Sequence, residues 1–401
     1  MATQATRYWN LLNSPWWATL ISCALTCKTL YNRARWHLRG NVVLSNRGDV
    51  VLFQRQLRDN PYLRPTMRFV TIVGAPDGQS AGPIPHLGTF AIMLSRYLTK
   101  AETLVINNAK WGAGSVRPGD IANLAAFRSI SELTLDHVCF ATVSQLTQLM
   151  SALPKLRNLF CKDLTCDQNT PVLSSLPLNS TQLRDISLWG CMPPAVHDFI
   201  LRIAKRADLR TLDMGVHFQD IFIGAIDIQK LLRACAPSLR DFGLSLNLNG
   251  VIDKSPDKIC QKLDISFLEH LTSLRLSSWC FLEDKHSWIP YMLSSLGTYD
   301  IPEVQIHFHI GRDDRDERLS ALLYRLDTED ELADIDKRLS QHKFSSIKPD
   351  MLEVGLAFSV GGCSPYEVLR VSEDEWAKLV RGKMPLADKR GILRTTVFKV
   401  C

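Results

Sequence analysis

An α/β solenoid, in which short parallel strands alternate with helices, is the fold class that this sequence predicts. Three observations support the prediction. The pattern L-x-x-L-x-L returns along most of the chain, nine copies between 67 and 306 begin 26 to 34 residues apart, and amphipathic segments lie between the copies. Regular self-similarity at such a period is typical of a repeat array.

The copies of the motif predict the strands. In x-L-x-L-x the two apolar side chains point to one side of a strand and the x residues point to the other. A single strand cannot bury its apolar side alone, whereas stacked parallel copies form a continuous core. The clear copies are ISELTL (130–135), LRNLFC (156–161), LRDISL (183–188), LRTLDM (209–214), LRDFGL (239–244) and LTSLRL (271–276), with weaker ones at 67–72, 101–106, 301–306 and 351–356. The residues expected to be buried include Leu133, Leu135, Leu159, Leu183, Leu188, Leu212 and Leu244.

The intervening segments predict the return helices. TVSQLTQLMSALP (142–154) places apolar residues three and four positions apart and ends at a proline. PPAVHDFILRIAKRA (193–207) begins on prolines that suit a first helical turn, and DIQKLLRACAP (227–237) has the same apolar spacing. Strand and helix alternating at about 28 residues is the leucine-rich-repeat arrangement, with parallel strands on the concave face and helices outside.

The C-terminal region departs from this pattern. The charge-dense segment 315–339 predicts one or two helices that cover the end of the solenoid, because terminal repeats need caps. MLEVGLAFSV (351–360) is a candidate last strand, and RVSEDEWAKLVRG (370–382) a short helix. The predicted domains are a small helical segment at 1–40, the solenoid at 41–310, and a helical cap and tail at 311–401.

The stretch CALTCKTLYNRARWHL (23–38) has three interpretations. No residue from Tyr8 to Cys27 is charged, but Asn, Ser, Thr and Pro interrupt the run, so a secretory or membrane-spanning segment is not favoured. Cys23 and Cys27 could share a metal, yet structural zinc needs four ligands at recognisable spacing. Helix packing is the simpler interpretation, through one apolar stripe of Leu20, Ala24, Cys27, Leu30 and Tyr31.

Composition excludes several functional classes. The net charge of +6 is mild and no block of five Lys or Arg residues occurs, so nucleic-acid binding is not favoured. The 11 cysteines lack a C-x-x-C pair, which favours reduced thiols in an intracellular protein. The chain has no G-x-S-x-G motif, and WGAGSVRPG (111–119) lacks the lysine of a phosphate loop.

One further cluster raises the possibility of a metal site. His307 and His309 alternate on a predicted strand ahead of three aspartates. Those acids alternate with Arg312, Arg315 and Arg318, so a solvated, salt-bridged helix start is the simpler account. We therefore expect neither catalysis nor a metal or other cofactor.

Residues 21–44 resemble the second half of an F-box, and the chain as a whole resembles the fungal proteins that combine an F-box with leucine-rich repeats. The matching positions are Ala24, Leu25, Cys27, Leu30, Arg33, Arg35, His37 and Leu38. The Leu-Pro-x-Glu helix that normally opens an F-box has no counterpart in MATQATRYWNLLNSPWW (1–17). The box is therefore either degenerate or truncated at the chain start.

The resemblance implies a cytoplasmic or nuclear substrate receptor of a Skp–cullin–F-box ubiquitin ligase. The F-box would bind the Skp-type adaptor, and through it the cullin, by way of Leu20, Ala24, Cys27 and Leu30. The repeats would bind a target protein, and no nucleic acid or membrane is involved. The alternative is a non-catalytic leucine-rich-repeat scaffold that does not bind the adaptor.

The x positions of the motifs indicate where a target would bind. Over eight strands they hold six acids against two fixed cations. Phe160 and Trp189, on adjacent repeats beside Asp185, have the composition of an interface hot spot for a basic segment. Alternatively, such faces are simply polar and Phe160 turns inward. The candidate target-binding residues are Glu132, Asp136, Phe160, Asp185, Trp189, Asp213 and Asp241.

Overall fold

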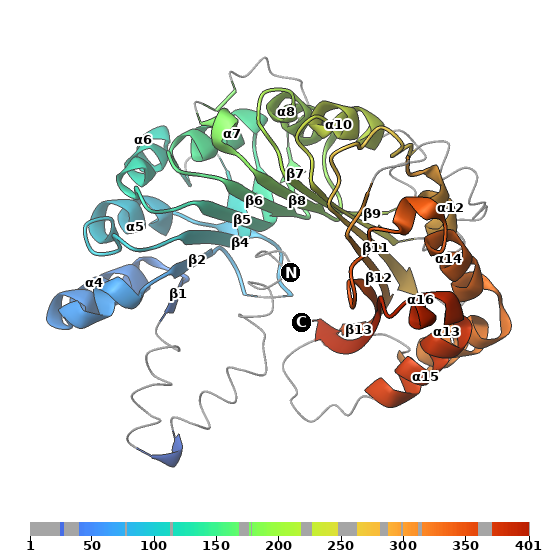
Figure 1. Ribbon diagram of the computed structural model, residues 1–401. Helices are drawn as coiled ribbons and strands as arrows, with labels where there is room; N and C mark the ends of the chain where they lie inside the picture. Colours follow the sequence, from blue (N-terminus) through green and yellow to red (C-terminus); the bar gives the residue numbers. More distant parts are fainter. Residues whose placement is uncertain are drawn as a thin grey trace. The chain divides into compact units, whose positions relative to one another are not determined.

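The computed structural model (Figure 1) shows a repeated strand–helix architecture. It describes residues 25–27, 40–76, 78–112, 115–167, 176–177, 179–217, 227–247, 263–280, 288–297, 300–311, 315–359 and 371–400. Two compact units divide between Leu209 and Arg210, inside the predicted solenoid at 41–310. We call Trp16–Leu209 the N-terminal unit and Arg210–Cys401 the C-terminal unit.

A parallel sheet whose strand order follows the chain forms the N-terminal unit. The order is β1-β2-β4-β5-β6-β8, and two short strands attach at the side, β3 to β4 and β7 to β5. Parallel neighbours require a crossover between each pair, which the intervening helices and loops supply. The strands are β1 (Asn41–Leu44), β2 (Phe69–Val73), β3 (Gly82–Pro83), β4 (Thr103–Trp111), β5 (Glu132–Phe140), β6 (Asn158–Lys162), β7 (Thr165–Cys166) and β8 (Asp185–Trp189).

Helices lie along one side of this sheet (Figure 1). They are α4 (Arg47–Asp59), η1 (Pro61–Thr66), α5 (His86–Leu94), α6 (Pro118–Ala122), η2 (Asn123–Ala126), α7 (Val143–Ser151), η3 (Ser180–Gln182) and α8 (Pro194–Ala204). The α4 helix begins where the Asn46 side chain accepts a hydrogen bond from the Asp49 amide at 3.0 Å, an N-cap. The predicted helices at 142–154 and 193–207 are confirmed as α7 and α8.

Motif leucines form the core, as the period-two pattern predicts. Leu133 pairs in register with Leu159, which pairs with Ile186, so apolar residues stack from strand to strand. Their side chains are at most 1% exposed. All seven leucines predicted to be buried are confirmed: Leu133, Leu135, Leu159, Leu183, Leu188, Leu212 and Leu244.

The C-terminal unit repeats the same design. Its strands pair in parallel in the order β9-β10-β11-β12-β13-β14. They are β9 (Thr211–His217), β10 (Asp241–Asn247), β11 (Ser273–Cys280), β12 (Glu303–Ile310), β13 (Leu352–Ser359) and β14 (Leu393–Val400). The helices are α10 (Ile228–Cys235), α12 (Trp288–Ser295), α13 (Arg315–Thr328), α14 (Glu331–Leu339), η4 (His342–Phe344), α15 (Glu373–Lys383) and α16 (Pro385–Lys389).

Residues 311–401 differ from the helical cap and tail that the sequence predicted. The expected helices are present, and the candidate strand at 351–360 is confirmed as β13, but β14 was not expected. Both strands continue the sheet in register with β12, so parallel strands extend to residue 400. Two helices, α13 and α14, fill the long interval before β13 and interrupt the spacing. Strand β14 reads LRTTVFKV and alternates Leu393, Thr395 and Val397 without the full motif.

Side chains from the last helices anchor them to the strands and to one another. The indole Nε1 of Trp376 on α15 donates to the Val354 carbonyl on β13 at 3.0 Å. Asp336 on α14 is 2% exposed and accepts from the amides of Leu386 and Ala387 at 2.8 Å each. These amides belong to the first turn of α16 and have no partner within that helix. Among the described residues, no helix is both long enough and apolar enough to cross a membrane.

Candidate protein-interaction surface

The x positions of the motif form a second, polar side of each sheet, which we call the strand face. In the N-terminal unit the strand register aligns these residues in rows across β4, β5, β6 and β8. The rows are Thr103, Glu132, Asn158 and Asp185; Val105, Thr134, Phe160 and Ser187; and Asn107, Asp136, Lys162 and Trp189. The predicted target-binding residues of this unit therefore do share one face.

Two aromatic side chains lie close together on this face. Phe160 pairs in register with Ser187, and Trp189 follows Ser187 by two residues on the same strand, so the two rings are diagonal neighbours. Both residues are half-buried, as is Asp185 on the other side of Ser187. The alternative in which Phe160 turns into the core is therefore wrong, since the core positions of β6 are Leu159 and Cys161.

The acids of the same face are less available than the sequence suggested. Glu132 is 8% exposed, and its carboxylate accepts from Thr103 Oγ1 at 2.9 Å and from Asn158 Nδ2 at 3.0 Å. Asp136 is also 8% exposed and lies 2.7 Å from His137 Nδ1 and 3.8 Å from Lys162 Nζ. Because both carboxylates are held by neighbours within the chain, they offer a target little surface.

Shortly after each strand motif of this unit, one residue adopts the left-handed backbone conformation, a feature that was not predicted from the sequence. Asn108, His137, Asp163 and Gly190 have φ angles of 49°, 52°, 48° and 70°. His137 Nε2 lies 3.5 Å from Asp163 Oδ2, and Asp163 Oδ1 accepts from the Cys191 amide at 3.1 Å. Asn, Asp, His and Gly adopt this conformation more readily than other residues, so their recurrence two positions after the motif was the available signal.

On the strand face of the C-terminal unit, one row is a charged ladder. The row comprises Asp213, Gly243, Arg275, Gln305, Glu353 and Arg394. Arg275 reaches across β10 to Asp213 Oδ1 at 2.9 Å. The contact depends on glycine at position 243, because a Cβ there would lie only 1.8 Å from that oxygen. Arg275 Nε also donates to Gln305 Oε1 at 3.0 Å. Asp213, which was predicted to bind a target, is only 4% exposed, and Arg275 of the same chain neutralises its charge.

Near the other end of the ladder, Glu353 neutralises the charge of Arg394. Its carboxylate forms an ion pair with Arg394, accepts from Thr396 Oγ1 at 3.0 Å and lies 3.3 Å from His307 Nε2. Burial alone would raise the pKa of Glu353, but the hydrogen bonds and charges of His307 and Arg394 outweigh it and lower this pKa to about 2. Neither Glu353 nor Arg394 was predicted as a site residue. The strand-face positions predicted from the sequence ended before the copy at 351–356, and β14 was not recognised.

His309 is a buried neutral imidazole on the same face. Its ring stacks on Trp279 with the centroids 5.1 Å apart and is 9% exposed. Burial, assisted by His307 and Arg275, lowers the pKa of His309 to about 3. In the described part of the chain, no three His, Cys, Asp or Glu side chains are grouped so as to hold a metal ion.

Asp241 occupies the row beside the ladder and is half-buried. Its carboxylate accepts from Thr272 Oγ1 at 3.3 Å and from Thr211 Oγ1 at 3.5 Å. Burial raises the pKa of Asp241, with a further contribution from the negative charge of Glu303. Of the acids predicted to bind a target, Asp185 and Asp241 therefore keep the most exposure.

The predicted adaptor-binding stripe falls almost entirely outside the described residues. Leu20, Ala24 and Leu30 lie in segments that the structure does not describe. Cys27 is described and exposed, and the nearby Leu25 is 82% exposed.

Comparison with known proteins gives little sequence similarity. No family model matches the chain, and no curated protein matches it in sequence. Among solved structures, the chain is similar to the leucine-rich repeat-containing protein LegL7 from Legionella pneumophila, at 12% identity over 90% of each chain and with a TM-score of 0.43.

Proposed function

We propose that this protein is a non-catalytic interaction scaffold that binds a target protein on the strand face of its N-terminal unit. The observation that carries the proposal is the half-buried pair of Phe160 and Trp189, which keep part of their surface exposed on adjacent strands. Clustered aromatic residues are enriched among those that dominate binding energy in protein interfaces.

The surroundings of the pair support a rigid binding surface. The strands beneath it are held in a parallel sheet over a fully buried core, and Glu132 and Asp136 are fixed by hydrogen bonds and ion pairs within the chain. A surface that is ordered before binding loses less conformational entropy when its target arrives.

The test is a comparison of proteins captured from cell extract by the wild type and by the double variant Phe160→Ala with Trp189→Ala. A matched control is Tyr62→Ala, which removes an aromatic side chain that is 59% exposed in η1, away from the motif strands. We expect the double variant to lose a specific set of partners that the control retains. If the double variant folds normally and captures the same set, the target does not bind at this pair.

At a finer level, we propose that the scaffold is a cytoplasmic or nuclear substrate receptor of a Skp–cullin–F-box ubiquitin ligase. Support comes from the resemblance of residues 21–44 to the second half of an F-box, since the last four residues of this segment form β1, the first strand of the sheet. Such a receptor performs no chemistry itself and raises the effective concentration of its target near the ubiquitin carrier.

Adaptor binding distinguishes this receptor from a plain scaffold. The measurement is co-purification with a Skp-type adaptor, comparing the intact chain with the double variant Leu20→Asp and Leu30→Asp. We expect the intact chain to retain the adaptor and the double variant to lose it, because charges on an apolar helix stripe prevent its burial. If the intact chain binds no adaptor while a control F-box protein does, the protein is a scaffold alone.

A further inference from the structure

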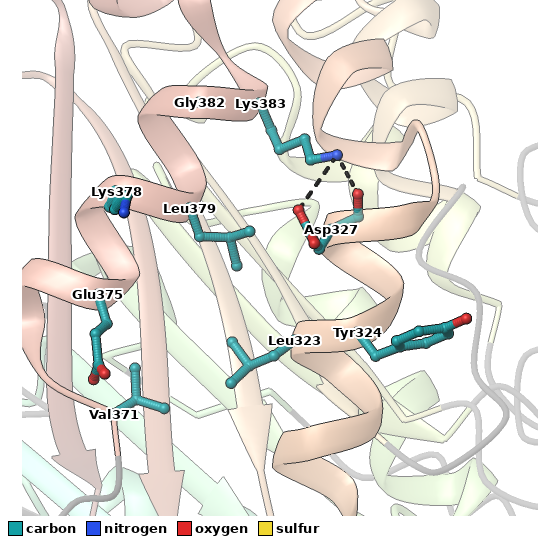
Figure 2. Close-up of a pocket in the computed structure, with 9 residues that line it drawn as sticks. All are labelled: Leu323, Tyr324, Asp327, Val371, Glu375, Lys378, Leu379, Gly382 and Lys383. Atoms are coloured by element: carbon teal, nitrogen blue, oxygen red, sulfur yellow. Dashed lines mark hydrogen bonds and ion pairs between the residues drawn. The ribbon is translucent and has the colours of Figure 1, made fainter.

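A groove of about 790 Å³ lies between α13 and α15 in the C-terminal unit. Figure 2 shows Leu323 of α13 and Leu379 of α15 pointing toward each other across it, with Val371 near one end. At the other end Lys383 and Asp327 form an ion pair at 3.6 Å that joins the two helices. The groove therefore has a leucine on each helical wall and an ion pair that bridges the two helices at one end.

The apolar side chains of the groove are incompletely covered. Leu323 and Leu379 are half-buried, and Tyr324 is 70% exposed. The volume is in the range of about 300–1,000 Å³ that is typical of ligand sites. Exposed apolar surface rimmed by polar residues marks interaction sites, and tyrosine is common among the residues that dominate binding.

The backbone around the groove favours a helical occupant. Both walls are helices, whose main-chain groups are bonded internally, so the groove offers no strand edge to an extended peptide. An extended peptide would leave its own amides and carbonyls unpaired against apolar walls, whereas a helix satisfies these groups itself. Apolar residues three or four positions apart on such a helix would enter together.

Two acids and two lysines line the groove, and their contacts within the chain differ. Lys383 is paired with Asp327, and Glu375 accepts from the Ser372 amide and hydroxyl at 2.9 Å each in the capping box of α15. Lys378 is exposed and, within the described chain, is the charged lining residue that has neither an ion pair nor a hydrogen bond. A carboxylate on the occupant would complement it.

We propose that the α13/α15 groove docks one amphipathic helix of a partner protein. Apolar residues one turn apart on that helix fill the space between Leu323 and Leu379, and an acidic residue at the edge of its apolar stripe pairs with Lys378. This surface belongs to the helical side of the C-terminal unit and is separate from the strand face, so its test is independent of the function proposed above.

The probes are fluorescein-labelled, hydrocarbon-stapled helical peptides with leucines at i, i+4 and i+7. The peptides of the panel differ in the position of one glutamate along either edge of the leucine stripe. Each has a matched peptide with lysine at that position. Each also has an unstapled version in which a proline interrupts the helix. Binding to the full-length protein is measured by fluorescence anisotropy. We expect the glutamate helices to bind best and the proline-interrupted peptides to bind weakly.

Charge reversal tests the specific contact. Lys378→Glu is expected to weaken binding of the preferred glutamate helix by about two- to fivefold, the range of an exposed ion pair, and to favour the matched lysine helix. Tyr324→Ala is expected to weaken both, while Lys389→Glu on α16, also exposed but outside the groove, is the matched control and should change neither. Equal binding of stapled and proline-interrupted peptides, insensitivity to Lys378→Glu, or binding by no helix of the panel would each overturn the proposal.

Discussion

Replacement of His309 by phenylalanine should remove a specific part of the acid sensitivity of this protein. The pKa of His309 is lowered to about 3 in the folded chain, mainly by burial, against 6.5 for an ordinary histidine. Between pH 6.5 and 3 the unfolded chain therefore binds one more proton than the folded chain at this residue. Stability contributed by neutral His309 is complete above pH 6.5 and falls as the pH drops toward 3.

The size of this effect follows from the two pKa values. One pKa unit corresponds to about 1.4 kcal/mol, so lowering the pH from 7 to 5 should cost roughly 2 kcal/mol through His309 alone. Phenylalanine keeps an aromatic ring against Trp279 and cannot be protonated. The variant should therefore lose roughly 2 kcal/mol less stability than the wild type over this interval.

Urea unfolding at pH 7 and pH 5, followed by tryptophan fluorescence, measures the difference. The control is His342→Phe, which replaces an exposed histidine in η4. It should leave the pH dependence of the wild type in place. If His309→Phe loses as much stability between pH 7 and 5 as the wild type does, His309 is not a buried neutral residue and the reasoning fails.

Three further substitutions test the core, the ladder and the helical anchor. Leu135→Ala should lower the free energy of unfolding by roughly 2–5 kcal/mol, measured in urea, because it leaves a cavity in a fully buried row; an unchanged unfolding midpoint would contradict the repeat register. Gly243→Ala should lower the free energy of unfolding by about 1–3 kcal/mol, because the added Cβ would collide with Asp213 and displace Arg275. The control is Gly382→Ala, where the added Cβ meets open space. Asp336→Ala should expose the α16 amides to faster hydrogen exchange and cost about 1–3 kcal/mol; unchanged protection there would refute its capping role.

The strands and the buried leucines were predictable because both are encoded locally. Alternation within six residues decides which side chains of a strand share a face, and Leu133 and Leu135 needed no knowledge of their neighbours. The spacing of the copies added the parallel stacking. Strand β14 was missed because its alternating residues, such as Thr395 and Val397, lack the leucine motif.

The partners of the charged side chains were not predictable in the same way. Arg275 and Asp213 are 62 residues apart in sequence, and they meet only because the register places Gly243 between them. A count of charges on the strand face of β9–β12 gives three acids, Asp213, Asp241 and Glu303, and one base, Arg275. The count cannot tell which acid Arg275 pairs with, whereas the structure shows that it is Asp213. The same reasoning applies to Glu353, whose partner Arg394 lies 41 residues later.

Charge is consequently a weaker guide to the target than the sequence suggested. Using Asp213 to hold a basic target would require withdrawing it from Arg275 and leaving that guanidinium partly buried without a counter-ion. Breaking such a pair costs more than an exposed ion pair returns. Within the described part of the chain, the side chains of Phe160 and Trp189 form no ion pair that a target would have to break. Covering their exposed surface yields about 25 cal/mol for each Å² of apolar area. This difference is why the function proposed above places the target on the aromatic pair and not on the buried acids of the ladder.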